Sequence, residues 1–137
     1  MFKNILNFNK NRIKRLTLAN LHQKMQEEKF DPNLIELLLV MFKKRIQENG
    51  EWEFQKWLND LNFRVPEEFQ NQEACRKVYL MSQPWLKAEV LQLEKETKLP
   101  WGVQDEDLSH LDEEVRKVQL VIRHRLTEIV NDLLYSS

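Results

Sequence analysis

The chain has 137 residues, 42% of them hydrophobic, which suits one domain with a buried core and argues against a disordered chain. Two glycines and four prolines are too few for the many tight turns of a strand-rich fold. The net charge of −1 hides an asymmetry, because residues 1–26 carry no acidic side chain and the rest carries 15 Lys and Arg against 22 Asp and Glu.

Several classes of protein are excluded by the same composition. Cys75 is the single cysteine, so no disulfide can form within the chain. No stretch approaches the roughly 18–20 apolar residues that cross a bilayer, and the most hydrophobic run, 34–42, contains Glu36. A secretory signal is not expected, since basic residues and asparagines interrupt the apolar residues at the N-terminus. These features predict a cytoplasmic protein.

The first predicted element is a basic amphipathic arm or first helix over residues 1–16. Its cations can contact the phosphates of a nucleic acid, or its apolar side can rest on a membrane surface. It can also pack on the acidic body as an ordinary first helix, which is the favoured interpretation, with the membrane surface as the least favoured. The candidate polyanion contacts of this arm are Lys3, Lys10, Arg12, Lys14 and Arg15.

Two capped helices are predicted next. Thr17 is expected to cap the first, whereas Asp31 and Pro32 begin the second, which ends at Asn49-Gly50. The second helix has apolar residues on nearly all sides, which is typical of a helix in the middle of a bundle or at a subunit interface. A second basic cluster lies at its C-terminal end, where cations also suit the helix dipole: Lys43, Lys44 and Arg45.

Three shorter helices are predicted in the middle of the chain, one with Trp52 and Trp57, one opened by Pro66 and one opened by Pro84. Trp52 and Trp57 are five residues apart, so one of them is expected to reach the surface or a partner. Trp101 lies in a predicted loop and is a candidate interface anchor, although such a residue more often folds back over the core. The expected inward positions of the two proline-opened helices are Phe69, Cys75, Val78, Tyr79, Leu80, Leu86, Val90 and Leu93.

The last predicted helix spans residues 110–134 and is the clearest in the sequence. Apolar residues recur at intervals of three and four from Leu111 to Leu133. Two ion pairs are expected on its exposed side, Asp112–Arg116 and Glu113–Lys117. The sequence therefore predicts an all-α fold, a compact bundle of five to six antiparallel helices with a long C-terminal helix. Residues 17–137 are expected to form this bundle as a single domain.

No catalytic, cofactor or metal site is predicted. Two glycines cannot form a phosphate-binding loop, and one cysteine cannot form a Cys/His zinc site. His124 and Glu128 have the spacing of two metal ligands on one helix, but Arg123 and Arg125 flank the histidine with positive charge. Cys75 is expected to be buried and inert.

These observations predict a non-enzymatic subunit or adaptor of a larger assembly, which docks on a protein partner or on further copies of itself. The docking elements are the apolar helix 32–49 and the tryptophans Trp52, Trp57 and Trp101. The alternative is a nucleic-acid-binding small subunit that contacts phosphates without reading sequence. In architecture alone, a small helical bundle with a basic side resembles the non-catalytic small subunits of CRISPR-type surveillance complexes.

Overall fold

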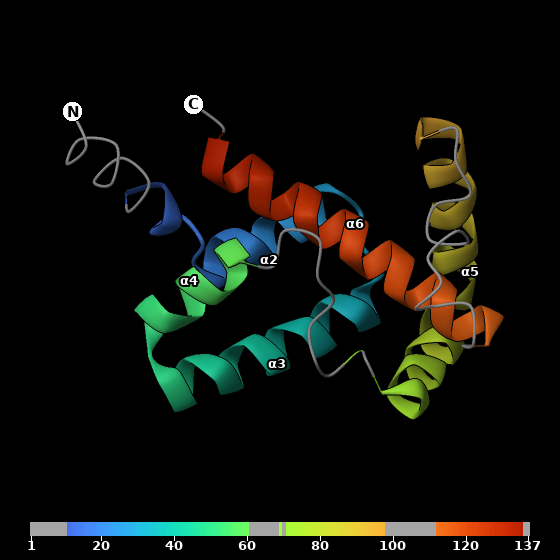
Figure 1. Cartoon of the computed structure of the whole chain (residues 1–137), viewed down its shortest axis with the longest axis horizontal. Coiled ribbons are helices and arrows are strands. Elements are labelled where there is room, and N and C mark those ends of the chain that lie inside the picture. Colours follow the sequence, from blue (N-terminus) through green and yellow to red (C-terminus); the bar gives the residue numbers. More distant parts are fainter. Residues whose placement is uncertain (1–10, 61–68, 70, 98–111, 136–137) are drawn as a thin grey trace. The chain divides into compact units, whose positions relative to one another are not determined.

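The structure is a computed structural model that describes residues 11–60, 69, 71–97 and 112–135. These residues form helices and no strand (Figure 1). The all-α fold with a long C-terminal helix is thus confirmed, while the antiparallel order of the helices stays a prediction. The helices are α2 (Leu18–Glu27), α3 (Pro32–Asn49), α4 (Glu51–Asp60), α5 (Gln72–Thr97) and α6 (Glu113–Tyr135).

The chain divides into two compact units. The first comprises Met1–Asn62 and Thr127–Ser137, and so contains α2, α3, α4 and the last turns of α6. The second comprises Phe63–Leu126 and contains α5 and the first part of α6. The predicted division into an arm, 1–16, and a single bundle, 17–137, is a different one and stays a prediction.

The helices of the first unit begin and end where local sequence signals place them. The Thr17 hydroxyl oxygen accepts a hydrogen bond from the Asn20 N–H at 3.1 Å and caps α2. The Asp31 carboxylate accepts from the N–H groups of Asn33 and Leu34 at 3.0 and 3.2 Å and caps α3. Gly50, with a φ of 89°, ends α3 in a conformation that residues with a Cβ rarely adopt, and α4 follows at once (Figure 1).

The core of the first unit is built around one side of α3, which contacts both α2 and α4. The ring of Phe42 is fully buried and lies 5.4 Å, centroid to centroid, from the ring of Phe54 on α4. The opposite side of α3 is exposed at Leu37 and Val40. Because one side of α3 is exposed, the interpretation of α3 as a central helix covered on all sides is wrong. The other interpretation, a helix at a subunit interface, stays a prediction. The buried side chains of α3 are Leu34, Ile35, Leu38, Met41 and Phe42.

The second unit departs from the predicted boundaries. Helix α5 begins at Gln72, where the Asn71 side-chain oxygen accepts from the N–H groups of Glu73 and Ala74 at 2.9 and 3.2 Å. The range of α5 extends past Pro84, but the backbone of Ser82 leaves helical geometry, with φ −119° and ψ 21°. A proline removes an N–H and crowds the preceding turn, so the break falls two residues before it. Helix α5 therefore consists of two helical segments that meet at a kink just before Pro84, close to the predicted start of the second helix. The predicted start of the first helix, Pro66, lies outside the described residues.

Most of the expected inward positions of α5 are buried, but Leu80 is 74% exposed and its prediction is wrong. Val78 and Ser82 are buried. Leu80 is two residues from each of them, and residues two apart on a helix point to opposite sides. The apolar character of Leu80 therefore does not reflect packing within the described part of this unit.

Helix α6 keeps the predicted periodicity, with Val115, Val118, Ile122, Leu126 and Ile129 all buried. The helix starts at Glu113, three residues later than predicted. No helix in the described part of the chain is long and apolar enough to span a membrane.

Of the two ion pairs predicted at the start of α6, one is present and the other is replaced by a different pair. The Glu113–Lys117 pair is present at 3.1 Å, and hydrogen bonding by Lys117 lowers the pKa of the Glu113 carboxyl. The Asp112 carboxylate instead accepts hydrogen bonds from Arg76 and Gln72, which come from α5. The bond from Arg76 lowers the pKa of Asp112. The predicted Asp112–Arg116 pair is thus replaced by one between two helices.

Candidate functional site

Two cations of the predicted N-terminal arm are in contact with the end of α6 in the first unit. The Arg12 guanidinium lies 4.9 Å from the centroid of the Tyr135 ring. The Arg15 guanidinium donates a hydrogen bond to the Leu134 carbonyl oxygen at 3.4 Å. The last carbonyl groups of a helix lack partners within it and carry partial negative charge, so a cation is favourable there. Arg12, which is half-buried, and Arg15, which is exposed, therefore both contact the end of α6 in the first unit.

The remaining cations of the arm do not share the side-chain contacts of these two arginines in the described part of the chain. The Lys14 side chain is exposed, although its backbone carbonyl accepts a hydrogen bond from the Gln55 amide at 3.2 Å. Lys3 and Lys10 lie outside the described residues. The candidate polyanion contacts of the arm are thus not one continuous free surface in the part of the chain that the structure describes.

The second basic cluster is also divided. Lys43 and Lys44 are exposed near the C-terminal end of α3. The Arg45 guanidinium lies 3.7 Å from the centroid of the Trp57 ring, within the range of a cation–π contact. Only the two lysines of this cluster therefore face solvent without a ring beneath them.

The candidate interface tryptophans Trp52 and Trp57 are half-buried on α4. Trp57 contacts the core, with ring centroids 6.2 Å from Phe42 and 6.1 Å from Phe54. The Lys56 ammonium lies 5.6 Å from the centroid of the Trp52 ring. Each ring thus has a cation over it, and neither tryptophan is a fully exposed anchor. Trp101 lies outside the described residues.

The exposed side of α3 combines apolar and charged groups, and we call it the α3 outer face. Val40 is 61% exposed and Leu37 is 37% exposed. The two are three residues apart and so lie next to one another on the helix surface. The face consists of Glu36, Leu37, Val40, Lys43 and Lys44, all of them exposed.

A second exposed apolar surface lies on α5 in the second unit. Leu80, Met81 and Leu91 are 74%, 45% and 60% exposed. We call these residues, with the exposed Lys77 and Lys87, the α5 outer face. Sequence reasoning missed this surface, because Leu80 was assigned to the core. The angular positions of the residues around the helix could have identified it. Leu80 and Leu91 both lie outside the stripe formed by Val78, Leu86 and Leu93.

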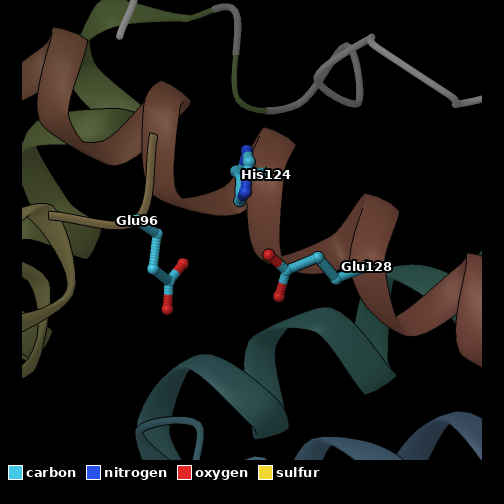
Figure 2. A group of neighbouring side chains, drawn as sticks. All are labelled: Glu96, His124 and Glu128. Carbon is cyan, nitrogen blue, oxygen red and sulfur yellow. The ribbon is translucent and has the colours of Figure 1, made fainter. Parts of the chain in front are cut away.

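Glu96, His124 and Glu128 form the one group in the described part of the chain with the composition of a metal site (Figure 2). One possible ligand atom from each lies within 4.8 Å of the others. His124 and Glu128 are one turn apart on the continuous helix α6, while Glu96 belongs to α5.

The surroundings of this group favour an ion-pair network over a metal site. The Glu96 carboxylate accepts hydrogen bonds from Gln92 at 3.2 Å and from the Arg125 guanidinium at 3.3 Å. Desolvation raises the pKa of Glu96, but the hydrogen bond from Gln92, the charge and hydrogen bond of Arg125 and the charge of His124 together outweigh it, and the net shift is downward. Arg125 also donates to Glu89. A fixed guanidinium charge beside the group repels a metal cation.

Cys75 is the single cysteine of the sequence, and its surroundings make its thiol unreactive. The side chain is fully buried, and its thiol donates a hydrogen bond to the Phe69 carbonyl oxygen at 2.7 Å. Burial raises the pKa of the Cys75 thiol to about 11, although a hydrogen bond with Gln119 acts in the opposite direction. The thiolate is the nucleophilic form, so Cys75 is almost entirely in its unreactive form at neutral pH.

No known family model, curated protein or solved structure matches the chain. The features of the described residues that bear on function are the two exposed apolar faces and the arrangement of the basic residues.

Proposed function

We propose that this chain is a non-enzymatic helical subunit or adaptor that acts by docking onto other proteins. One observation carries the proposal: each of the two units exposes large apolar side chains on the outer side of a helix. Val40 on the α3 outer face and Leu91 on the α5 outer face are 61% and 60% exposed. Contiguous exposed apolar surface rimmed by charge is typical of protein-interaction sites.

The state of the N-terminal arginines supports docking to protein over binding to nucleic acid. A phosphate-binding arm needs its cations free to displace counterions from the polyanion. Arg12 and Arg15 are instead in contact with Tyr135 and Leu134 at the end of α6. Releasing them for phosphate would remove these contacts from the first unit.

A nucleic-acid-binding small subunit remains the second candidate, because Lys14, Lys43 and Lys44 are exposed. These lysines could neutralise phosphates without reading sequence. The two functions differ in their dependence on salt and on apolar residues, and this difference allows one set of variants to separate them.

The first experiment isolates the tagged full chain from its native cells, with and without nuclease, and quantifies the proteins retained. We expect a protein partner at a fixed molar ratio that nuclease does not release. Leu80→Glu with Leu91→Glu, or Leu37→Glu with Val40→Glu, should lower that ratio by about tenfold, since a charge buried in an interface is costly. The control, Ala19→Glu with Gln26→Glu, adds two negative charges at exposed positions of α2 and should leave the ratio unchanged.

The second experiment follows the fluorescence anisotropy of labelled single-stranded RNA, single-stranded DNA and duplex during titration with the protein at several salt concentrations. We expect flat traces at low salt. Binding that weakens steeply with salt, and that is lost when Lys14, Lys43 and Lys44 become Ala, would replace the docking function with the second candidate.

A further inference from the structure

We propose that the α3 outer face pairs with the α3 outer face of a second copy of this chain, antiparallel, about a twofold axis close to Val40. This inference rests on the proposed function, because it names the partner of one of the two docking faces. Three features of α3 support this pairing: the order of charges along it, their positions around it and the regularity of the helix.

The charges on this face are separated along the helix. Glu36 lies about 6 Å before Val40, and Lys43 lies about 4.5 Å after it, at a rise of about 1.5 Å per residue. In an antiparallel pair centred near Val40, the acidic end of each helix lies across from the basic end of the other. A parallel pair would instead place like charges side by side. The charge order therefore selects an antiparallel pair in which both copies use the same surface.

The positions around the helix agree with this pairing. At about 100° per residue, all members of the α3 outer face lie within about 60° of the direction of Val40. Glu36 and Lys43 lie on one side of that direction, whereas Leu37 and Lys44 lie on the other. In the pair, Glu36 of one copy faces Lys43 of its partner copy, and Leu37 faces the aliphatic stem of Lys44.

The charged groups of the face are not committed elsewhere in the described part of the chain. Glu36, Lys43 and Lys44 are exposed, and none forms an ion pair with another described residue. The helix itself is regular from its Asp31 cap to Gly50. The α5 outer face lacks this regularity, because Ser82 leaves helical geometry within it. A straight, symmetric helix pair therefore fits α3 and not α5.

The expected dimer is weak and reversible. One helix face with two large apolar side chains buries far less than the roughly 1,200 Å² of total surface typical of stable complexes. The paired fraction should rise with protein concentration, and the interaction should weaken with salt because its ion pairs lie at the rim.

A cysteine introduced at the twofold axis tests the geometry directly. Facing Cα atoms of closely packed helices come within the roughly 4–7 Å that a disulfide needs. We expect Val40→Cys to form a covalent dimer with diamide, which accepts two electrons and two protons from the paired thiols. The control, Leu91→Cys, is equally exposed, at 60% against 61%, and should stay monomeric. Native Cys75 is buried with a thiol pKa raised to about 11, so it contributes no cross-link.

A charge-reversal cycle tests the pairing of Glu36 with Lys43. Glu36→Lys and Lys43→Glu each place like charges together at both ends of the pair and should raise the dissociation constant about tenfold. The double variant restores opposite charges and should return the constant to within about twofold of the original. Sedimentation equilibrium of the purified full chain measures all four proteins, and circular dichroism checks that each is folded.

Two results would overturn the pairing: additive weakening in the double variant, or cross-linking at Leu91→Cys as efficient as at Val40→Cys. If the pairing fails while the α5 outer face still retains a protein partner, the adaptor function stands and the self-pairing alone is removed. If neither face retains any protein, both the adaptor function and the self-pairing are contradicted.

Discussion

Helices α3 and α5 each bury one side and expose apolar residues on the other, but they achieve this differently. Helix α3 is regular, is capped by Asp31 and Gly50, and buries only apolar side chains. Helix α5 breaks at Ser82 and buries this serine together with Cys75. An exposed apolar face therefore occurs both on a helix with a purely apolar buried side and on one that also buries Ser82 and Cys75. The composition of the buried side does not explain why the outer side is apolar.

The difference in regularity also separates the kinds of partner that each face suits. The α3 outer face has its acid at one end and its lysines at the other, which favours a second copy of itself. The α5 outer face is interrupted at Ser82 and carries Lys77 and Lys87 beside its leucines. A partner with acidic residues around an apolar patch suits this face better.

The largest expected effect separates the inner and outer sides of α3. Phe42→Ala removes a fully buried ring that contacts Phe54 and Trp57, and should lower the free energy of unfolding by about 3–5 kcal/mol. Val40→Ala, on the exposed side, should change it by less than about 0.5 kcal/mol at protein concentrations too low for pairing. Urea denaturation followed by circular dichroism measures both. Similar losses at the two positions would contradict the assignment of Val40 to a docking surface.

The buried thiol of α5 makes the stability of the second unit sensitive to alkaline pH. The Cys75 thiol has a pKa near 9.0 when unfolded and about 11 when folded, so the unfolded chain loses its proton first. Its contribution to stability is complete below pH 9 and is lost as the pH rises towards 11, by roughly 2 kcal/mol. No buried group of α3 titrates in this way.

Comparison with Cys75→Ala isolates this contribution, because other titrations are common to both proteins. Urea denaturation across this pH range should show the difference in stability between the two proteins changing steadily. The wild-type protein should lose its relative advantage between pH 9 and 11. A constant difference would show that burial does not raise the thiol pKa.

The sequence predicted α3 well because its boundaries depend on neighbouring residues alone. The carboxylate of Asp31 bonds backbone groups two and three residues away, and Gly50 provides the positive φ at the other end. For α5 the same reasoning selected Pro84, which follows the kink at Ser82, but it did not select Asn71, which caps the beginning of the helix. The sequence offers several start signals in that region, and local patterns alone do not rank them.

The candidate site was less predictable, because it depends on which apolar residues remain uncovered. Leu80 and Val78 are equally apolar in the sequence, yet one is 74% exposed and the other 2%. The cations posed the same problem, since Arg15 donates to the carbonyl of Leu134, 119 residues away. Local patterns identify amphipathic helices, whereas contacts between distant segments decide which surfaces stay free.

The smallest predicted effect compares the caps of the two helices. Asp31 and Asn71 each accept two backbone hydrogen bonds, and Ala at either position should cost about 1 kcal/mol. Asp31 also carries a negative charge at the positive end of the α3 dipole, so Asp31→Ala should cost about 0.5 kcal/mol more than Asn71→Ala. Salt screens that additional interaction, and the two losses should converge at high ionic strength. Urea denaturation at low and high salt measures the convergence, with Asn33→Ala as the control for a change in the first turn that leaves the cap intact. A gap that is independent of salt would mean that Asp31 stabilises α3 through hydrogen bonding alone.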